Sequence, residues 1–139
     1  MDDLSSLHSA EPSPQWPGEV EVLNRAVGGS STLEWLEPGG YLDRAMDDWD
    51  KYLDRVDVLW WYQGESDALA GDVEVYFSRT EEILERIRAR FGHVPVILVQ
   101  LAHCRLPESE YPNARANYRI VAEQQRWFKS HAPHFHVVP

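Results

Sequence analysis

Four stretches of the chain have the apolar pattern of β-strands. The two in the middle are nearly continuous apolar runs, which is typical of strands that are covered on both faces. The first is a short alternation of apolar and polar residues, and the last is a short segment at the C-terminal end. In chain order, the predicted strands cover residues 20–24, 56–62, 94–101 and 134–138.

Amphipathic helices are predicted between these strands, because apolar residues there recur at steps of three or four. Leu42 and Trp49 lie on one such stripe, and Asp72 is a candidate N-cap for the following helix. A short helix is also expected at residues 33–36, where Pro38-Gly39-Gly40 stops it. The longer predicted helices cover residues 41–55, 72–91 and 113–131.

This alternation of strands and helices predicts an α/β domain with a parallel sheet between layers of helices. In such sheets the functional site lies at the carboxyl ends of the strands. That position alone selects three loops, at residues 27–32, 63–70 and 102–112. Residues 1–18 are rich in proline, serine and acidic residues and are expected to be an irregular or disordered tail, which leaves residues 19–139 as the domain.

Charge and cysteine content narrow the class of function. The chain has 139 residues and a formal net charge of −10. This acidity argues against nucleic acids and anionic membranes as partners, because both require clustered basic residues. No apolar run approaches the roughly 20 residues of a membrane span, and the acidic N-terminus does not resemble a signal peptide. A single cysteine, Cys104, excludes an intrachain disulfide and a cysteine-based zinc site.

The most informative polar segment is Gln63-Gly64-Glu65-Ser66-Asp67, directly after a hydrophobic strand. In one interpretation the Gln63 amide donates to a developing oxyanion. In the other the segment is a polar loop, in which Glu65 and Asp67 accept hydrogen bonds from nearby backbone N–H groups. Position alone does not decide between the two.

The glycine pair Gly28-Gly29 before Ser30 is a second candidate. Glycine after a strand lets a backbone N–H approach a ligand, and a helix that begins just beyond favours an anion. The alternative is an ordinary turn. The spaced glycines and the lysine of nucleotide-binding loops are absent. Trp35 and Trp16 are candidates for stacking on a sugar, or for the core.

Histidines give a weaker signal. His134 and His136 share one face of a predicted strand near His131, but a dipole-favoured helix end and exposed strand positions explain them without a metal. His103 is a better site candidate because it lies in a loop at a strand end. Cys104, in the same loop, is expected to be a small buried residue.

Together, the two polar loops resemble a known family. Residues 58–67 closely match the W-Y-Q-G-E-S-D block of the sialate O-acetylesterase-like family, carbohydrate esterases within the SGNH hydrolases. Residues 24–31, followed by Trp35, resemble the family's Asn-x-Ala-x-Gly-Gly-Ser/Thr block and its tryptophan. The resemblance extends over about residues 20–139.

The resemblance implies hydrolysis of a small-molecule or glycan ester by a serine nucleophile on a flavodoxin-like, three-layer SGNH-type sandwich, with no metal or organic cofactor. It assigns the oxyanion hole to the Gly29 N–H and the Gln63 amide, and such donors are worth about 3 kcal/mol each. Glu65 and Asp67 are implied to hold the loop in shape. Further candidates near the substrate are Ser30, Trp35 and His103.

Two catalytic elements of the family are not found. The early Gly-Gln-Ser-Asn stretch is absent, and the serines of residues 1–18 (Ser5, Ser6, Ser9 and Ser13) follow no predicted strand. The Asp-x-x-His element that supplies the base does not occur in the sequence. We therefore expect a partial domain without the first strand and the C-terminal catalytic loop, with an exposed sheet edge or apolar helix face. The alternative is a non-catalytic carbohydrate-binding or interaction module derived from such an esterase.

Overall fold

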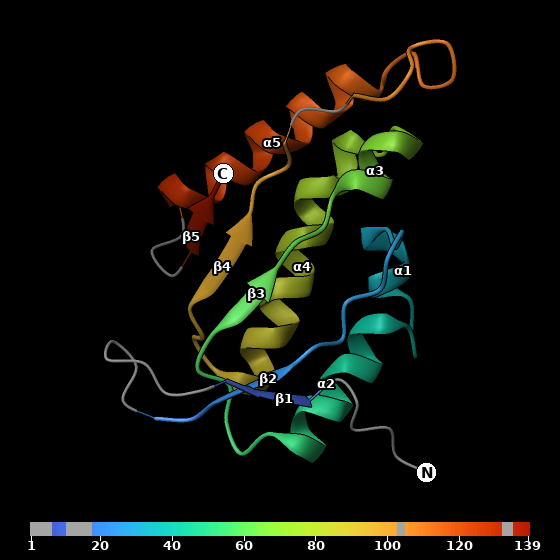
Figure 1. Ribbon diagram of the computed structural model, residues 1–139. Helices are drawn as coiled ribbons and strands as arrows, with labels where there is room; N and C mark the ends of the chain where they lie inside the picture. Colours follow the sequence, from blue (N-terminus) through green and yellow to red (C-terminus); the bar gives the residue numbers. More distant parts are fainter. Residues whose placement is uncertain (1–6, 11–17, 103–104, 132–134) are drawn as a thin grey trace.

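The computed structural model of the chain describes residues 7–10, 18–102, 105–131 and 135–139. Its strands and helices alternate along the second half of the chain, as Figure 1 shows. In chain order, the elements are β1 (Leu7–Ala10), β2 (Val20–Leu23), α1 (Thr32–Leu36), α2 (Tyr41–Tyr52), β3 (Leu59–Trp61), α3 (Glu65–Ala70), α4 (Val73–Phe91), β4 (Val96–Val99), α5 (Ala114–His131) and β5 (Phe135–Val138).

The main sheet consists of three parallel strands in the order β3-β4-β5. In its register, Leu59 lies beside Val96 and Val96 beside Phe135. Each strand follows its neighbour in the same direction, so right-handed crossovers place α4 and α5 on the same face of the sheet. The expected α/β class with a parallel sheet is confirmed.

One face of this sheet forms the main core. Leu59, Trp61, Val96, Leu98 and Phe135 alternate along the three strands and are at most 6 % exposed. They belong to one cluster with buried apolar residues of α1, α2 and α4 and with Phe128 of α5. All four helices therefore contribute to the same layer of packing.

The opposite face, which we call the open face, has no such cover among the described residues. Trp60, between two buried neighbours on β3, is 68 % exposed, and His136 on β5 is also exposed. The expectation that the 56–62 strand is covered on both faces is wrong for this part of the chain. The described residues form two layers, so a second helical layer of the expected three-layer sandwich is not among them.

The N-terminal part differs most from expectation. Residues 20–23 form a strand, but β2 pairs antiparallel with β1 instead of joining the parallel sheet. Residues 7–10, expected in an irregular tail, are that partner strand. The second difference is α3, which occupies residues 65–70 where a loop was expected.

The helix boundaries follow the sequence signals closely. Asp72 precedes α4, but its carboxylate forms an ion pair with Arg79 at 3.2 Å and makes no side-chain hydrogen bond to the helix N-terminus. Gly92, with φ of +81°, ends α4. Within the described residues, no helix is long and apolar enough to cross a membrane.

Candidate active site

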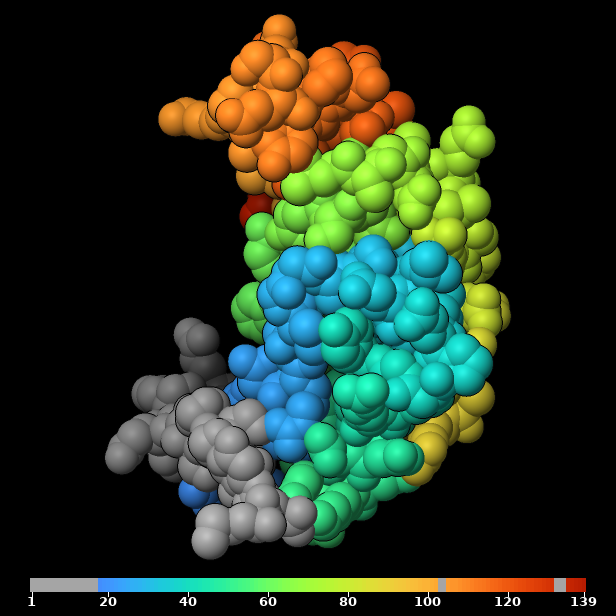
Figure 2. All heavy atoms as spheres, turned by 90° about the vertical axis from the view of Figure 1, so that its right-hand side faces the viewer, coloured from blue at the N-terminus to red at the C-terminus, as the bar shows by residue number. Residues whose placement is uncertain are grey.

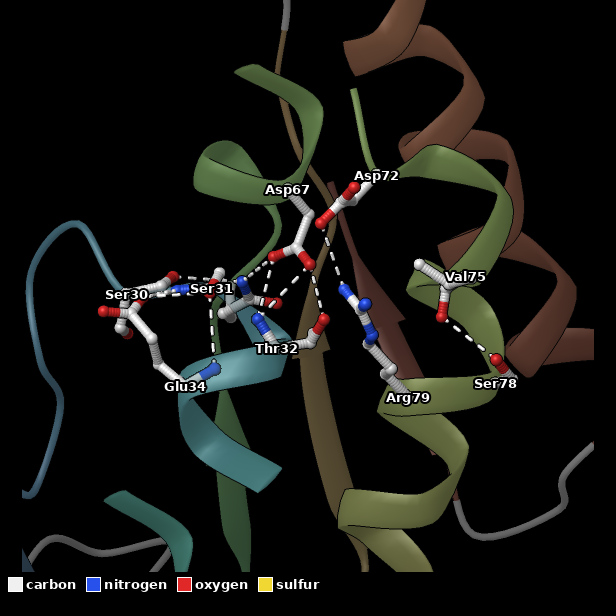
Figure 3. A network of polar contacts seen from close by, with 10 residues as sticks. Ser30, Ser31, Thr32, Glu34, Asp67, Asp72, Val75, Ser78 and Arg79 are labelled. Carbon is white, nitrogen blue, oxygen red and sulfur yellow. Dashed lines mark hydrogen bonds and ion pairs between the residues drawn. The ribbon is translucent and has the colours of Figure 1, made fainter. Parts of the chain in front are cut away.

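A buried carboxylate joins two of the three predicted loops at the carboxyl end of the sheet. Asp67, in α3, has no exposed surface and accepts hydrogen bonds from the Thr32 backbone N–H at 3.0 Å and from the Thr32 hydroxyl. Figure 3 shows this carboxylate pointing at the start of α1. In Figure 2 the surfaces of α1 and α3 adjoin, with residues 105–113 at the same end of the molecule. The tertiary structure therefore brings residues 30–32 and 63–67 together.

The first turn of α1 is closed by protein groups. Ser31 and Glu34 form a capping box, in which the Glu34 carboxylate accepts from the Ser31 N–H at 2.8 Å. That backbone hydrogen bond is the main reason why the pKa of Glu34 lies below its ordinary value. Since Glu34 accepts from the Ser31 N–H and Asp67 from the Thr32 N–H, these two donors at the start of α1 are already occupied. An anion at the N-terminus of α1 is therefore disfavoured.

Gln63 lies between the two loops, with 5 % of its surface exposed. Its Nε2 donates to the Ser30 carbonyl oxygen at 3.1 Å and to the Asp67 carboxylate. Both acceptors require the amide nitrogen, so they fix which way the amide points. The buried Oε1 has no hydrogen-bond partner among the described residues.

Gln125 and Tyr76 hold the main chain of Gln63 in place. Gln125 Nε2 donates to the Gln63 carbonyl and to the Tyr76 hydroxyl, both at 3.0 Å, and the Tyr76 hydroxyl donates to the same carbonyl at 3.1 Å. Gln125 Oε1 accepts from the Leu101 N–H at 2.7 Å, just beyond β4. One buried side chain on α5 thus links the carboxyl ends of β3 and β4. Burial raises the pKa of Tyr76 well above its ordinary value, so its hydroxyl remains a donor.

Sequence reasoning did not assign Gln125, Tyr76 or Thr32 to the site. All three are fully buried polar residues. The available signal was a glutamine on the apolar stripe of α5, four residues after Val121 and three before Phe128. A polar group in that position needs a partner inside the protein, because an unbonded buried amide is costly.

Two glycines have conformations that side chains rarely adopt. Gly64, with φ of +137°, begins the turn into α3, and an added Cβ would lie 3.0 Å from Val121 and 3.2 Å from Leu101. Gly29, with φ of +74°, is exposed, and its N–H makes no hydrogen bond to any residue that the structure describes. The Gly29 N–H is therefore a donor without a partner among the described residues, one residue before Ser30.

Trp35 belongs to the core and not to an open surface. It is 5 % exposed, contacts Trp61 edge-on at a centroid distance of 5.1 Å, and donates from Nε1 to the Ser30 hydroxyl at 2.7 Å. With so little of the ring exposed, the structure favours the core over sugar stacking, the two alternatives that the sequence left open for Trp35. Its contact with Ser30 gives it a positioning role for the 27–32 loop.

The remaining candidates lie at the rim or outside the described residues. Glu65 is half-buried, and its carboxylate raises the pKa of the neighbouring Tyr62 hydroxyl by charge repulsion of the phenolate. His103, Cys104, His134 and Trp16 fall in segments that the structure does not describe. Among the residues it does describe, no group of three or more histidine, cysteine, aspartate or glutamate side chains could hold a metal ion.

These features define an α/β protein whose polar loops meet at the carboxyl end of a parallel sheet. The model of the family described as carbohydrate esterase, sialic acid-specific acetylesterase, matches residues 11–139, almost the whole sequence. The chain belongs to this family, as the two sequence blocks indicated. No curated protein matches the chain.

Proposed function

We propose that this chain forms the oxyanion-binding part of a carbohydrate acetylesterase site, with the Gly29 N–H and the Gln63 amide as donors. The observation that carries the proposal is the contact between the family's two sequence blocks through Asp67. Negative charge develops on the ester carbonyl oxygen during acyl transfer, and fixed donors lower that barrier. Because the family is described as sialic acid-specific acetylesterases, an O-acetylated sialic acid is the first substrate to test.

The two acceptors of Gln63 predict which contact the oxyanion displaces. Nε2 has only two hydrogens, and both already have protein acceptors. The bond to Asp67 is charge-assisted and is the stronger one, whereas the bond to the Ser30 carbonyl joins neutral groups at 3.1 Å. An incoming oxyanion therefore replaces or shares the Ser30 contact, while Asp67 retains the amide.

The family's Gly-Gln-Ser-Asn and Asp-x-x-His elements, which supply the nucleophile and the base, do not occur in the sequence. The Ser30 hydroxyl donates to the Val27 carbonyl, the Ser31 hydroxyl to Glu34, and the Ser78 hydroxyl to the Val75 carbonyl. A serine hydroxyl without a base is a poor nucleophile. We therefore propose that the chain alone does not hydrolyse esters, and that a longer polypeptide with both catalytic elements does.

Two measurements test this proposal. Hydrolysis of an O-acetylated sialic acid by the chain is expected to stay at the uncatalysed rate. In a titration with the same compound, the amide resonances of Gly29 and of the Gln63 side chain are expected to shift. Non-acetylated sialic acid is the matched ligand, and Gln63→Ala is the matched variant.

The outcomes separate the two parts of the proposal. Turnover that Gln63→Ala abolishes would overturn the inactivity of the chain but support the site. Turnover that Gln63→Ala leaves unchanged, or equal shifts with the non-acetylated sugar, would overturn the site.

The second candidate function is a carbohydrate-binding or interaction module without catalysis. It is favoured by the serine hydroxyls that donate to internal acceptors. This alternative predicts that acetylated and non-acetylated sugars bind equally, without hydrolysis, and that Gln63→Ala changes both affinities by the same factor.

A further inference from the structure

Gln125 is a fully buried amide on the inward face of α5. Its neighbours on that face, Val121 and Phe128, are buried and apolar. An amide has two N–H donors and a carbonyl acceptor, and leaving these groups unpaired inside a protein is costly. The contacts that pair them in Gln125 therefore determine which parts of the site this side chain holds.

Both donor bonds of Gln125 are made at the end of β3. Nε2 donates to the Gln63 carbonyl oxygen and to the Tyr76 hydroxyl, both at 3.0 Å. The Tyr76 hydroxyl donates to the same carbonyl oxygen at 3.1 Å. This oxygen has two lone pairs, and two buried donors occupy them. Because the carbonyl belongs to the planar peptide between Gln63 and Gly64, these donors fix the plane of that peptide.

The same peptide packs directly on α5. A Cβ added at Gly64 would lie 3.3 Å from Gln125 Nε2 and 3.0 Å from Val121. No side chain therefore separates this turn from the helix. A shift of the Gln125 amide is expected to move the main chain from which the Gln63 side chain extends.

The acceptor of Gln125 is used at the end of β4. Oε1 accepts from the Leu101 N–H at 2.7 Å, two residues after the strand ends at Val99. The donor and the acceptor of one amide lie in one plane, so both strand ends are tied to the same rigid group. A carboxylate in this position would keep the contact with Leu101 but would have no hydrogen to donate.

The Gln63 side chain is thus held at two places. Its Nε2 donates to the Ser30 carbonyl oxygen and to the Asp67 carboxylate, which decide where the amide points. Gln125 and Tyr76 decide where the side chain begins. A misplacement of about 1 Å in a catalytic group can cost about a hundredfold in rate, so both ends contribute to placing this donor.

We propose that Gln125 is a positioning residue for the oxyanion donor Gln63, and that it makes the position of this donor depend on the end of β4. The inference rests on the proposed function, because that function assigns Gln63 to the oxyanion site. Gln125 itself acts only through the Gln63 main chain.

Gln125→Glu is the variant that tests the inference. The introduced carboxylate still accepts from the Leu101 N–H, but it also attracts the Tyr76 hydroxyl, so the Gln63 carbonyl loses both of its donors. We expect the side-chain amide resonances of Gln63 to move in the ligand-free protein. The affinity for an O-acetylated sialic acid should fall by about fivefold or more.

The matched control makes the same change one residue earlier. Gln124 Nε2 donates to the Val73 carbonyl oxygen at 2.7 Å and has no contact with Gln63. Gln124→Glu should therefore leave the Gln63 resonances and the affinity unchanged. Circular dichroism and the Thr32 amide resonance establish that each variant is folded and keeps the Asp67 contact.

A pH titration distinguishes positioning from a general loss of packing. Burial raises the pKa of the carboxyl that Gln125→Glu introduces above its ordinary value of about 4.3. As the pH falls from about 8 to about 5, this carboxyl gains a proton that it can donate to the Gln63 carbonyl. The Gln63 resonances should therefore return toward those of the parent. Loss of packing alone would give no such return.

The outcomes separate this inference from the proposed function. Unchanged Gln63 resonances in folded Gln125→Glu, a shift without pH dependence, or an unchanged affinity would each overturn the inference and leave the proposed function standing. A parent protein that binds no ester would overturn the proposed function, while the ligand-free resonances still decide whether Gln125 positions Gln63. If Gln125→Glu does not fold, Tyr76→Phe removes one of the two donors, and unchanged Gln63 resonances in that variant would overturn the inference.

Discussion

The aliphatic residues of strand β4 lie alternately in two very different surroundings. Val96 and Leu98 point into the core and are 2 % and 0 % exposed, whereas Ile97 and Val99, which alternate with them, are only half-buried. The side chains are of the same chemical type, so composition does not explain the difference. The direction of the crossovers explains the difference in exposure, because it places the helices that follow β3 and β4 on one side of the sheet. A parallel strand can therefore be hydrophobic on both faces and buried on only one.

Leu98→Ala should produce the largest effect, because it opens a cavity on the covered face. We expect the free energy of unfolding to fall by about 2–5 kcal/mol, measured by urea denaturation. Val99→Ala, the neighbour on the open face, should cost less than about 1.5 kcal/mol. Equal losses from the two variants would contradict the difference between the faces.

Asp67→Asn tests the stability contributed by the buried polar site at the carboxyl end of the sheet. Asparagine replaces a charged acceptor that serves the Thr32 N–H, the Thr32 hydroxyl and the Gln63 amide. Because hydrogen bonds to charged groups are worth more than neutral ones, we expect a loss of about 1.5–3 kcal/mol on urea denaturation. Glu65→Gln, two residues earlier and half-buried, is the control and should change stability by less than about 0.5 kcal/mol.

Alkaline pH provides a third test, through Tyr76. Burial raises the pKa of its hydroxyl, so the folded state keeps the phenol neutral while the unfolded chain ionises near its ordinary pKa of 10.0. The contribution to stability is complete below pH 10 and decreases as the pH rises above it. Urea denaturation of Tyr76→Phe should show lower stability at neutral pH and a shallower alkaline decline. An unchanged alkaline slope would be evidence against a buried, neutral Tyr76.

The smallest effect is expected on the open face itself. Trp60→Thr retains a residue suited to strands and removes a side chain that is already 68 % exposed. Its free energy of unfolding should stay within about 0.5 kcal/mol of the parent. A loss as large as that of Leu98→Ala would mean that Trp60 is buried within the monomer.

The candidate site was predictable only in part. Gln63 and Gly29 were selected as candidates because they follow apolar segments and match a family block, and both signals are local in sequence. Gln125 was not found, because its contact with Gln63 joins residues 62 positions apart. For Trp35 the sequence left both the core and sugar stacking open, because a position next to a loop gives no measure of burial; the structure places it in the core.

The sequence by itself determined the α/β class, the main helices and the two polar loops, because hydrophobic period, capping residues and glycines act over a few neighbouring residues. The tertiary structure decided that β2 leaves the parallel sheet, that α3 replaces a loop, and that the Gln63 amide is held between Ser30 and Asp67. It also decided which face of the sheet is covered. Alternation along a strand tells which residues share a face, but only the path of the connecting helices determines which face they bury.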